Sequence, residues 1–144
     1  MKAVVTRVSS ASVTIDENIT GKIDNGFLVL LGIRTDDTSE NAKKLAAKIC
    51  NLRVFNDTEG KMNLDLKSVD GSILVISQFT LYADTSSRRP GFTAAARPDV
   101  AIPLYELFVE ECRNVGFTVE TGVFGAMMDV ASVNDGPVTI ILEN

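Results

Sequence analysis

Apolar and polar residues alternate at the start of the chain. In residues 2–8, Ala3, Val5 and Arg7 fall on one side, and the intervening residues fall on the other. A period of two predicts a β-strand with one face toward a core. A Ser-Ser-Ala break follows, and residues 13–15 resume the alternation. The pattern therefore predicts two short strands at the N-terminus.

Two later runs are almost entirely apolar and predict strands buried on both faces. They cover residues 26–33 and 73–76, and such runs are typical of central strands. Shorter strands are predicted over residues 53–55, 118–120, 127–133 and 138–142. Strands thus dominate the chain.

Helical spacing of apolar residues appears in two places. The first helix should begin near Thr38 or Ser39, either of which can cap it. The second should be capped by Asp99 and end at Gly116. Together these elements predict a single α+β domain over residues 1–144, with a mostly antiparallel β-barrel-like sheet and two main helices packed outside it.

The composition restricts the chemistry. The chain has no histidine, which excludes Ser-His-Asp and Cys-His catalytic units and histidine-based zinc sites. Its two cysteines, Cys50 and Cys112, lie on apolar helix faces and are interpreted as reduced core thiols. There is no Walker loop, no GxGxxG fingerprint, no CxxC pair and no calcium loop. We therefore expect neither a metal nor a cofactor.

The charge is acidic overall, with 14 basic and 19 acidic residues and a net charge of −5. This argues against coating of nucleic acid through bulk charge. Residues 84–98 are an exception, because they contain three arginines, Arg88, Arg89 and Arg97, and only one acidic residue. Phe92 in the same segment could stack on a base. The alternative is a solvated loop. With no secretory pattern and no apolar run of about 20 residues, we expect a cytoplasmic protein without a membrane span.

The most informative motif is Ser77-Gln78-Phe79-Thr80, directly after the buried run 73–76. Three hydrogen-bonding side chains at the end of an apolar strand could line a pocket. A hydroxyl of Ser77 or Thr80 could also be a nucleophile, but without histidine it would need another base. The alternative is a strand that simply emerges into solvent.

Two further motifs lie downstream. Asp135-Gly136 is a strong turn signal, so residues 134–139 are most simply a hairpin. If the bond between Gly136 and Pro137 were cis, it could aim two carbonyl oxygens in nearly the same direction. Farther upstream, Phe124 beside a glycine, with Met128, could hold a flat ring. Core packing is the alternative for that pair.

In combination these motifs resemble the D-aminoacyl-tRNA deacylase family. The resemblance rests on residues 77–80 followed by 134–139, and it extends to the opening strand and to residues 60–63. It implies a cytoplasmic homodimer that hydrolyses the ester joining a D-amino acid to the terminal adenosine of tRNA. It also implies hydrolysis of glycine misattached to alanine tRNA.

The resemblance further implies the role of each site residue. Ser77, Gln78, Phe79 and Thr80 would form one wall of the pocket. Gly136-Pro137 would be cis and would enter the pocket from the partner subunit, where its carbonyl oxygens reject an L-side chain. Phe124 and Met128 would lie near the adenine, and contact with the tRNA acceptor end would fall near Arg88 and Arg89.

Two mechanisms and one different function remain open at this point. In the first mechanism, backbone N–H groups near Phe79 and Thr80 stabilise the oxyanion, and the ribose 2′-OH of the substrate orients the water. In the second, Thr80 is a covalent nucleophile. The different function is a β-barrel that binds RNA ends or small amino acids without turnover.

Overall fold

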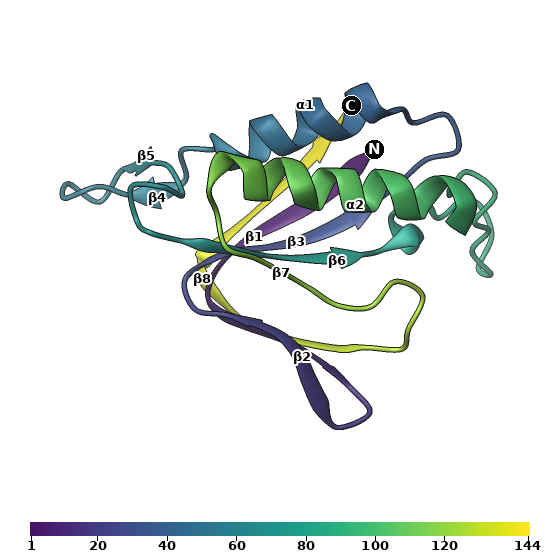
Figure 1. Ribbon diagram of the computed structural model, residues 1–144, viewed down its shortest axis with the longest axis horizontal. Helices are drawn as coiled ribbons and strands as arrows, with labels where there is room; N and C mark the ends of the chain where they lie inside the picture. Colours follow the sequence, from purple (N-terminus) through teal and green to yellow (C-terminus); the bar gives the residue numbers. More distant parts are fainter.

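The computed structural model describes all 144 residues and consists mainly of one curled sheet covered by two helices (Figure 1). The strands are β1 Lys2–Ile15, β2 Asn18–Ile23, β3 Gly26–Gly32, β4 Phe55–Asn56, β5 Met62–Leu64, β6 Ser72–Ser77, β7 Val119–Thr121 and β8 Asp129–Glu143. The helices are α1 Ser39–Cys50 and α2 Pro98–Val115, and a 3₁₀ turn η1 Phe79–Tyr82 follows β6. Neither α-helix combines the length and the apolar character that crossing a membrane requires.

Strand directions in the main sheet are mixed, so the prediction of a mostly antiparallel sheet is only partly right. Strand β1 pairs antiparallel with β2, β3 and β8, whereas β3, β6 and β7 run parallel to one another. Parallel neighbours need a crossover connection, and here α1 lies between β3 and β6 in the chain and α2 lies between β6 and β7. The α+β class and the nearly closed, barrel-like sheet are confirmed.

Strand β1 is one long strand where the sequence predicts two. Its first half pairs with β3 and its second half with β2, while β8 runs along both halves. The register against β8 shifts on either side of Val8. Such bulges bend a strand without ending it. The Ser-Ser-Ala segment is therefore a bend, and β2 and β5 are strands that the pattern did not predict.

Both helices cover the same face of the sheet (Figure 1). Helix α1 begins after Thr38, whose backbone N–H donates to Asn41 Oδ1 at 2.8 Å. The N-cap of α2 is Arg97, so the prediction of Asp99 is wrong. Pro98 takes the first helical position, where its fixed φ suits the helix and no N–H is needed. Gly116 ends α2 in the left-handed region, as predicted.

The end of β6 is held from both faces of the sheet. Ile73 and Val75 belong to the larger core beneath the helices, and Leu74 and Ile76 belong to a smaller core on the opposite face. The prediction that this strand is buried on both faces is confirmed. Cys50 and Cys112 are free and buried in the larger core, also as predicted. The neighbouring Cys50 thiol and burial raise the pKa of the Cys112 thiol.

Candidate active site

The chain changes direction where β6 ends. Gln78 donates its backbone N–H to Leu31 O at 2.8 Å, which anchors the turn to the neighbouring strand β3. The following residues, Phe79 to Tyr82, form η1. Gln78 Nε2 lies 2.5 Å from Thr80 Oγ1, to which it donates a hydrogen bond. The strand end is therefore an ordered polar corner between β6 and η1.

This corner forms one wall of a pocket of about 420 Å³. The opposite wall comes from the segment between β7 and β8 and from Val130 at the start of β8. The lining residues are Ile76, Ser77, Gln78, Phe79, Thr80, Phe124, Gly125, Ala126, Met127, Met128 and Val130. The strand-end motif and the Phe124–Met128 pair, more than 40 residues apart in the sequence, thus meet in one cavity.

No side chain in this pocket is ionisable. Its polar groups are hydroxyls, one amide and the backbone. The backbone N–H groups of Phe79 and Thr80 precede the first hydrogen bond of η1, from Leu81 N–H to Gln78 O, so the turn itself offers them no acceptor. Free, oriented N–H groups can stabilise an oxyanion. The pocket can therefore bind a polarised carbonyl, but it holds no side-chain acid or base.

Tyr105 of helix α2 packs against Phe124. The two rings meet edge-on, with 6.2 Å between the ring centroids. The Tyr105 hydroxyl donates to Val75 O at 2.8 Å and is buried. Burial raises the pKa of Tyr105 to about 12, so this hydroxyl remains neutral at physiological pH. Phe124 is therefore a rigid apolar surface, as a residue that contacts a flat ring would need to be.

Gly136 and Pro137 lie outside this pocket within the same chain. The hairpin interpretation of residues 134–139 is wrong, because β8 continues through them to Glu143. The register between β8 and β1 shifts at this point, so the turn-forming residues are accommodated as an irregularity within the strand. The Gly136-Pro137 peptide bond is cis, and both residues are exposed.

Arg7 is a site residue that sequence reasoning missed. It is only 5% exposed. Its guanidinium donates to Asp135 O at 3.2 Å, to Val54 O at 2.7 Å and to Asn56 Oδ1 at 3.2 Å. Arg7 also forms an ion pair with the Asp135 carboxylate at 3.2 Å. Arg7 therefore fixes the residue before Gly136. The sequence did contain one signal for Arg7: it falls on the same side of its strand as the apolar residues Ala3 and Val5.

Arg88 and Arg89 do not line the pocket. They are exposed in the loop between η1 and α2, and neither forms an ion pair. Phe92 of the same loop does approach the site, because its ring packs against Phe79. The loop therefore adjoins the pocket through an aromatic contact and carries its arginines outside it.

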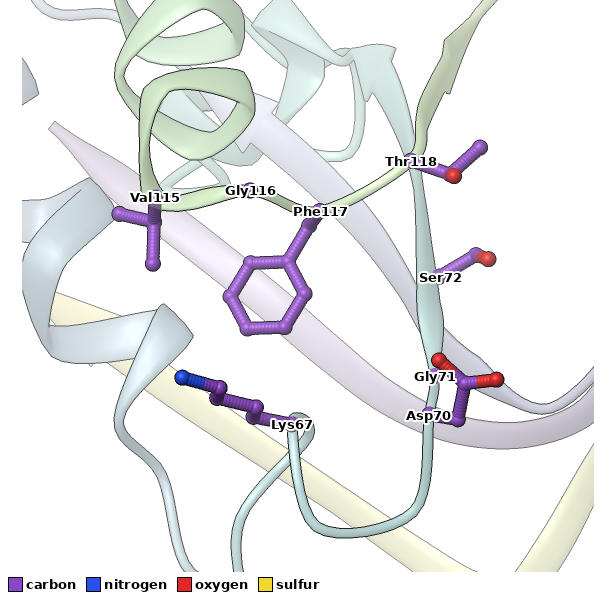
Figure 2. Close-up of a pocket in the computed structure, with 8 residues that line it drawn as sticks. All are labelled: Lys67, Asp70, Gly71, Ser72, Val115, Gly116, Phe117 and Thr118. Atoms are coloured by element: carbon purple, nitrogen blue, oxygen red, sulfur yellow. The ribbon is translucent and has the colours of Figure 1, made fainter.

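A second pocket of about 400 Å³ lies at the opposite end of β6 (Figure 2). Phe117 and Lys67 face each other across it, beside Gly116 at the end of α2. None of the site residues predicted from the sequence lines this second pocket. No group of three or more His, Cys, Asp or Glu side chains is arranged to hold a metal ion.

Comparisons with known proteins agree with this geometry. A family model described as "D-Tyr-tRNA(Tyr) deacylase" matches residues 4–143. The D-aminoacyl-tRNA deacylase of Exiguobacterium sibiricum is 58% identical over 144 residues, which cover 99% of each chain. The enzyme of the same name from Thermus aquaticus is 55% identical over 100% of this chain and 95% of its own.

A solved structure agrees as well. The "c-Myc DNA Unwinding Element Binding Protein" superposes with a TM-score of 0.94 at 40% identity, over 100% of this chain and 99% of its own. Both the sequence and the fold match over the full length, including both walls of the pocket. The chain therefore belongs to the D-Tyr-tRNA(Tyr) deacylase family and is a hydrolase of the D-aminoacyl-tRNA deacylase type.

Proposed function

We propose that this hydrolase cleaves D-aminoacyl and glycyl esters of tRNA and that it rejects L-aminoacyl esters through Gly136-Pro137 of a second subunit. The observation that carries the proposal is the pocket at the end of β6. It offers free backbone N–H groups and an apolar ring surface but no ionisable side chain. Such a pocket suits an ester that is already activated and that brings its own hydroxyl group.

The proposed reaction is a direct attack by water. The water oxygen bonds to the ester carbonyl carbon, and the N–H groups of Phe79 and Thr80 stabilise the resulting oxyanion. The ribose 2′-OH of the terminal adenosine orients the water. The bond between the carbonyl carbon and the ribose oxygen then breaks, and the proton lost by the water ends on that ribose oxygen. The products are a free amino acid and tRNA.

Thr80 has a supporting role in this mechanism. Its hydroxyl accepts a hydrogen bond from Gln78 Nε2, and no base lies in the pocket to remove its proton. We expect Thr80→Val to retain single-turnover cleavage of D-tyrosyl-tRNA within about tenfold of wild type, since only one hydrogen bond is lost. Loss of about a thousandfold or more with substrate binding retained would instead make Thr80 the nucleophile.

The pH dependence of the single-turnover rate tests the absence of a side-chain base. The pocket has no ionisable side chain, so the substrate amino group is the only group at the site that titrates near neutral pH, at about pH 7.7–8.0. Tyr105 behind Phe124 stays protonated, because burial raises its pKa to about 12. The rate should therefore show one inflection, which disappears with an ester that lacks the amino group. An inflection that persists with such an ester would reveal a catalytic side chain.

Strand β8 is the proposed contact with the partner subunit. This strand pairs only with β1, so its other edge is free. Apolar side chains are exposed on or beside it, among them Met127 at 92%, Ile141 at 68% and Val133 at 57%. A free edge with exposed apolar side chains suits pairing with a second copy of the chain. Such a dimer would cover the exposed Gly136-Pro137 segment.

Selection by a clash explains both the D-preference and the glycine activity. The Gly136 and Pro137 carbonyl oxygens would occupy the space that an L-side chain needs, while a D-side chain would point away. Glycine has no side chain to clash. We therefore expect glycyl esters, including glycine on alanine tRNA, to be cleaved together with D-aminoacyl esters.

The test is a comparison of D-tyrosyl-, L-tyrosyl- and glycyl-tRNA, with ester loss followed over time. The proposal predicts rapid loss of the D- and glycyl esters and loss of the L-ester at the uncatalysed rate. Cleavage of the D-ester alone would contradict selection by a clash, since a clash cannot exclude glycine. Equal cleavage of D- and L-esters would contradict stereochemical selection altogether.

A further inference from the structure

An aromatic pair stands at the mouth of the pocket. The ring centroids of Phe79 and Phe92 are 5.1 Å apart, and the ring planes are nearly perpendicular at 73°. Phe79 lines the pocket, whereas Phe92 stands outside its lining. Both rings are exposed, Phe79 by 53% and Phe92 by 36%. Apolar ring surface therefore continues from the pocket onto the loop beyond it.

The backbone holds Phe92 in place from both sides. Asp84 and Gly91 exchange two backbone hydrogen bonds of 2.8 and 3.0 Å, which close the loop before Phe92. After Phe92, Ala96 donates to Ile33 O at 2.8 Å, which attaches the loop to the residue that follows β3. The ring is thus presented by a fastened loop at a defined distance from Phe79.

The same loop carries positive charge that the protein does not neutralise. Arg88 and Arg89 are exposed and form no ion pair. The only acid in the loop, Asp84, accepts hydrogen bonds from Ser86, which lower the pKa of its carboxyl group. Two unpaired guanidinium groups in the same loop as an exposed ring match the phosphates and bases of single-stranded RNA.

We propose that Phe92, supported by the edge of Phe79, stacks on the base of the nucleotide that precedes the terminal adenosine, and that Arg88 and Arg89 bind the adjacent phosphates. This inference rests on the proposed function, because it requires the terminal adenosine in the neighbouring pocket. It assigns Phe92 as a positioning residue that acts on the tRNA end and not on the ester. Phe92 therefore contributes only when the substrate extends past the adenosine.

The test compares a D-tyrosyl ester of adenosine with a D-tyrosyl ester of the last three nucleotides of tRNA. Loss of one base–aromatic stack should lower kcat/KM of Phe92→Leu on the trinucleotide ester by about 5- to 150-fold. The adenosine ester should be cleaved as by wild type, and Phe92→Tyr should keep both activities. Changing Arg88 and Arg89 to Gln should reduce the slope of the salt dependence of the trinucleotide reaction by about 0.7 for each phosphate that is no longer neutralised.

Phe117→Leu is the matched control, because it makes the same change beside the second pocket at the far end of β6 (Figure 2). It should leave both substrates unaffected. An equal loss on both esters in Phe92→Leu would mean that Phe92 only supports Phe79, and no loss on either would mean that the ring binds nothing. Both results overturn the inference while leaving the deacylase intact. Failure of wild type to cleave any D-ester would overturn the proposed function itself.

Discussion

Arg7→Met is expected to lower the free energy of unfolding by about 1–3 kcal/mol, because the buried carbonyl oxygen of Val54 loses its donor. Val54 O and Asn56 Oδ1 bind Arg7 Nη1 at 2.7 and 3.2 Å. Methionine fills a similar volume but donates no hydrogen bond. The Asp135 carboxylate is 54% exposed, so it can regain water when its ion pair is lost. Denaturation in urea measures the change.

The same substitution should also weaken stereochemical selection. Arg7 Nε holds Asp135 O, the carbonyl directly before Gly136, at 3.2 Å. Without that bond the Gly136-Pro137 segment loses its fixed position, and L-esters should begin to be cleaved. Arg53→Met is the control, since Arg53 is exposed and binds only Asn63. Equal effects of the two substitutions on stability and on selection would show that Arg7 has no special role.

Gly136→Ala is expected to lower the ratio of D- to L-ester cleavage by at least about tenfold, or 1.4 kcal/mol. At φ +119, a Cβ on residue 136 would lie 2.8 Å from Arg7 Nη2 and 3.0 Å from Val138 Cγ2. An alanine is strained at this φ in any case. The segment must therefore shift away from Arg7, and its carbonyl oxygens move with it. Cleavage of the D-ester should change little, because in the proposed dimer a D-side chain points away from these carbonyl oxygens.

Gly116→Ala is the control for Gly136→Ala. It separates the effect of backbone strain at a positive φ from the effect of moving the Gly136-Pro137 segment. Gly116 has nearly the same φ, +113, but no atom lies within 4 Å of a Cβ built on it. This control should lose stability and keep the D-to-L ratio of wild type. The ratio is measured as kcat/KM on D- and L-tyrosyl-tRNA. An unchanged ratio in Gly136→Ala would remove Gly136 from the account of selectivity.

The wall of the site that comes from β6 was predictable from local pattern. An apolar run that ends in Ser, Gln, Phe and Thr marks both the strand and its polar end. The opposite wall carries only a weak local signal, since the pattern at Phe124 and Met128 favours core packing. Their meeting with Thr80 depends on the crossover through α2, which brings β7 parallel to β6. That is a tertiary effect that no local pattern contains.

The errors in the prediction have a common cause. Ser9-Ser10-Ala11 and Asp135-Gly136 are residues that usually end strands, yet β1 and β8 pass through both segments. The two strands pair with each other along their length, and their register shifts absorb the irregular residues. Arg7 was missed for a related reason. Its partners Val54, Asn56 and Asp135 come from distant parts of the chain and become neighbours only in the folded sheet.

The absence of histidine from the chain agrees with the absence of acid–base side chains from the pocket. The pocket has no ionisable side chain, so the missing histidines are part of a wider lack of acid–base groups. The proposed mechanism therefore uses the backbone N–H groups of Phe79 and Thr80 and the substrate's own hydroxyl. The net charge of −5 is compatible with tRNA because Arg88 and Arg89 are free in one loop beside the pocket.

In the proposed dimer, one subunit supplies the pocket and the other supplies Gly136-Pro137. A mixed dimer tests this arrangement, with Gly136→Ala in one subunit and Ala126→Trp filling the pocket of the other. Two different affinity tags isolate the mixed species. The only open pocket then faces an intact Gly136-Pro137 from its partner, so the account predicts the D-to-L ratio of wild type. A mixed dimer with the relaxed ratio of Gly136→Ala would contradict it, because selection would then arise within a single subunit.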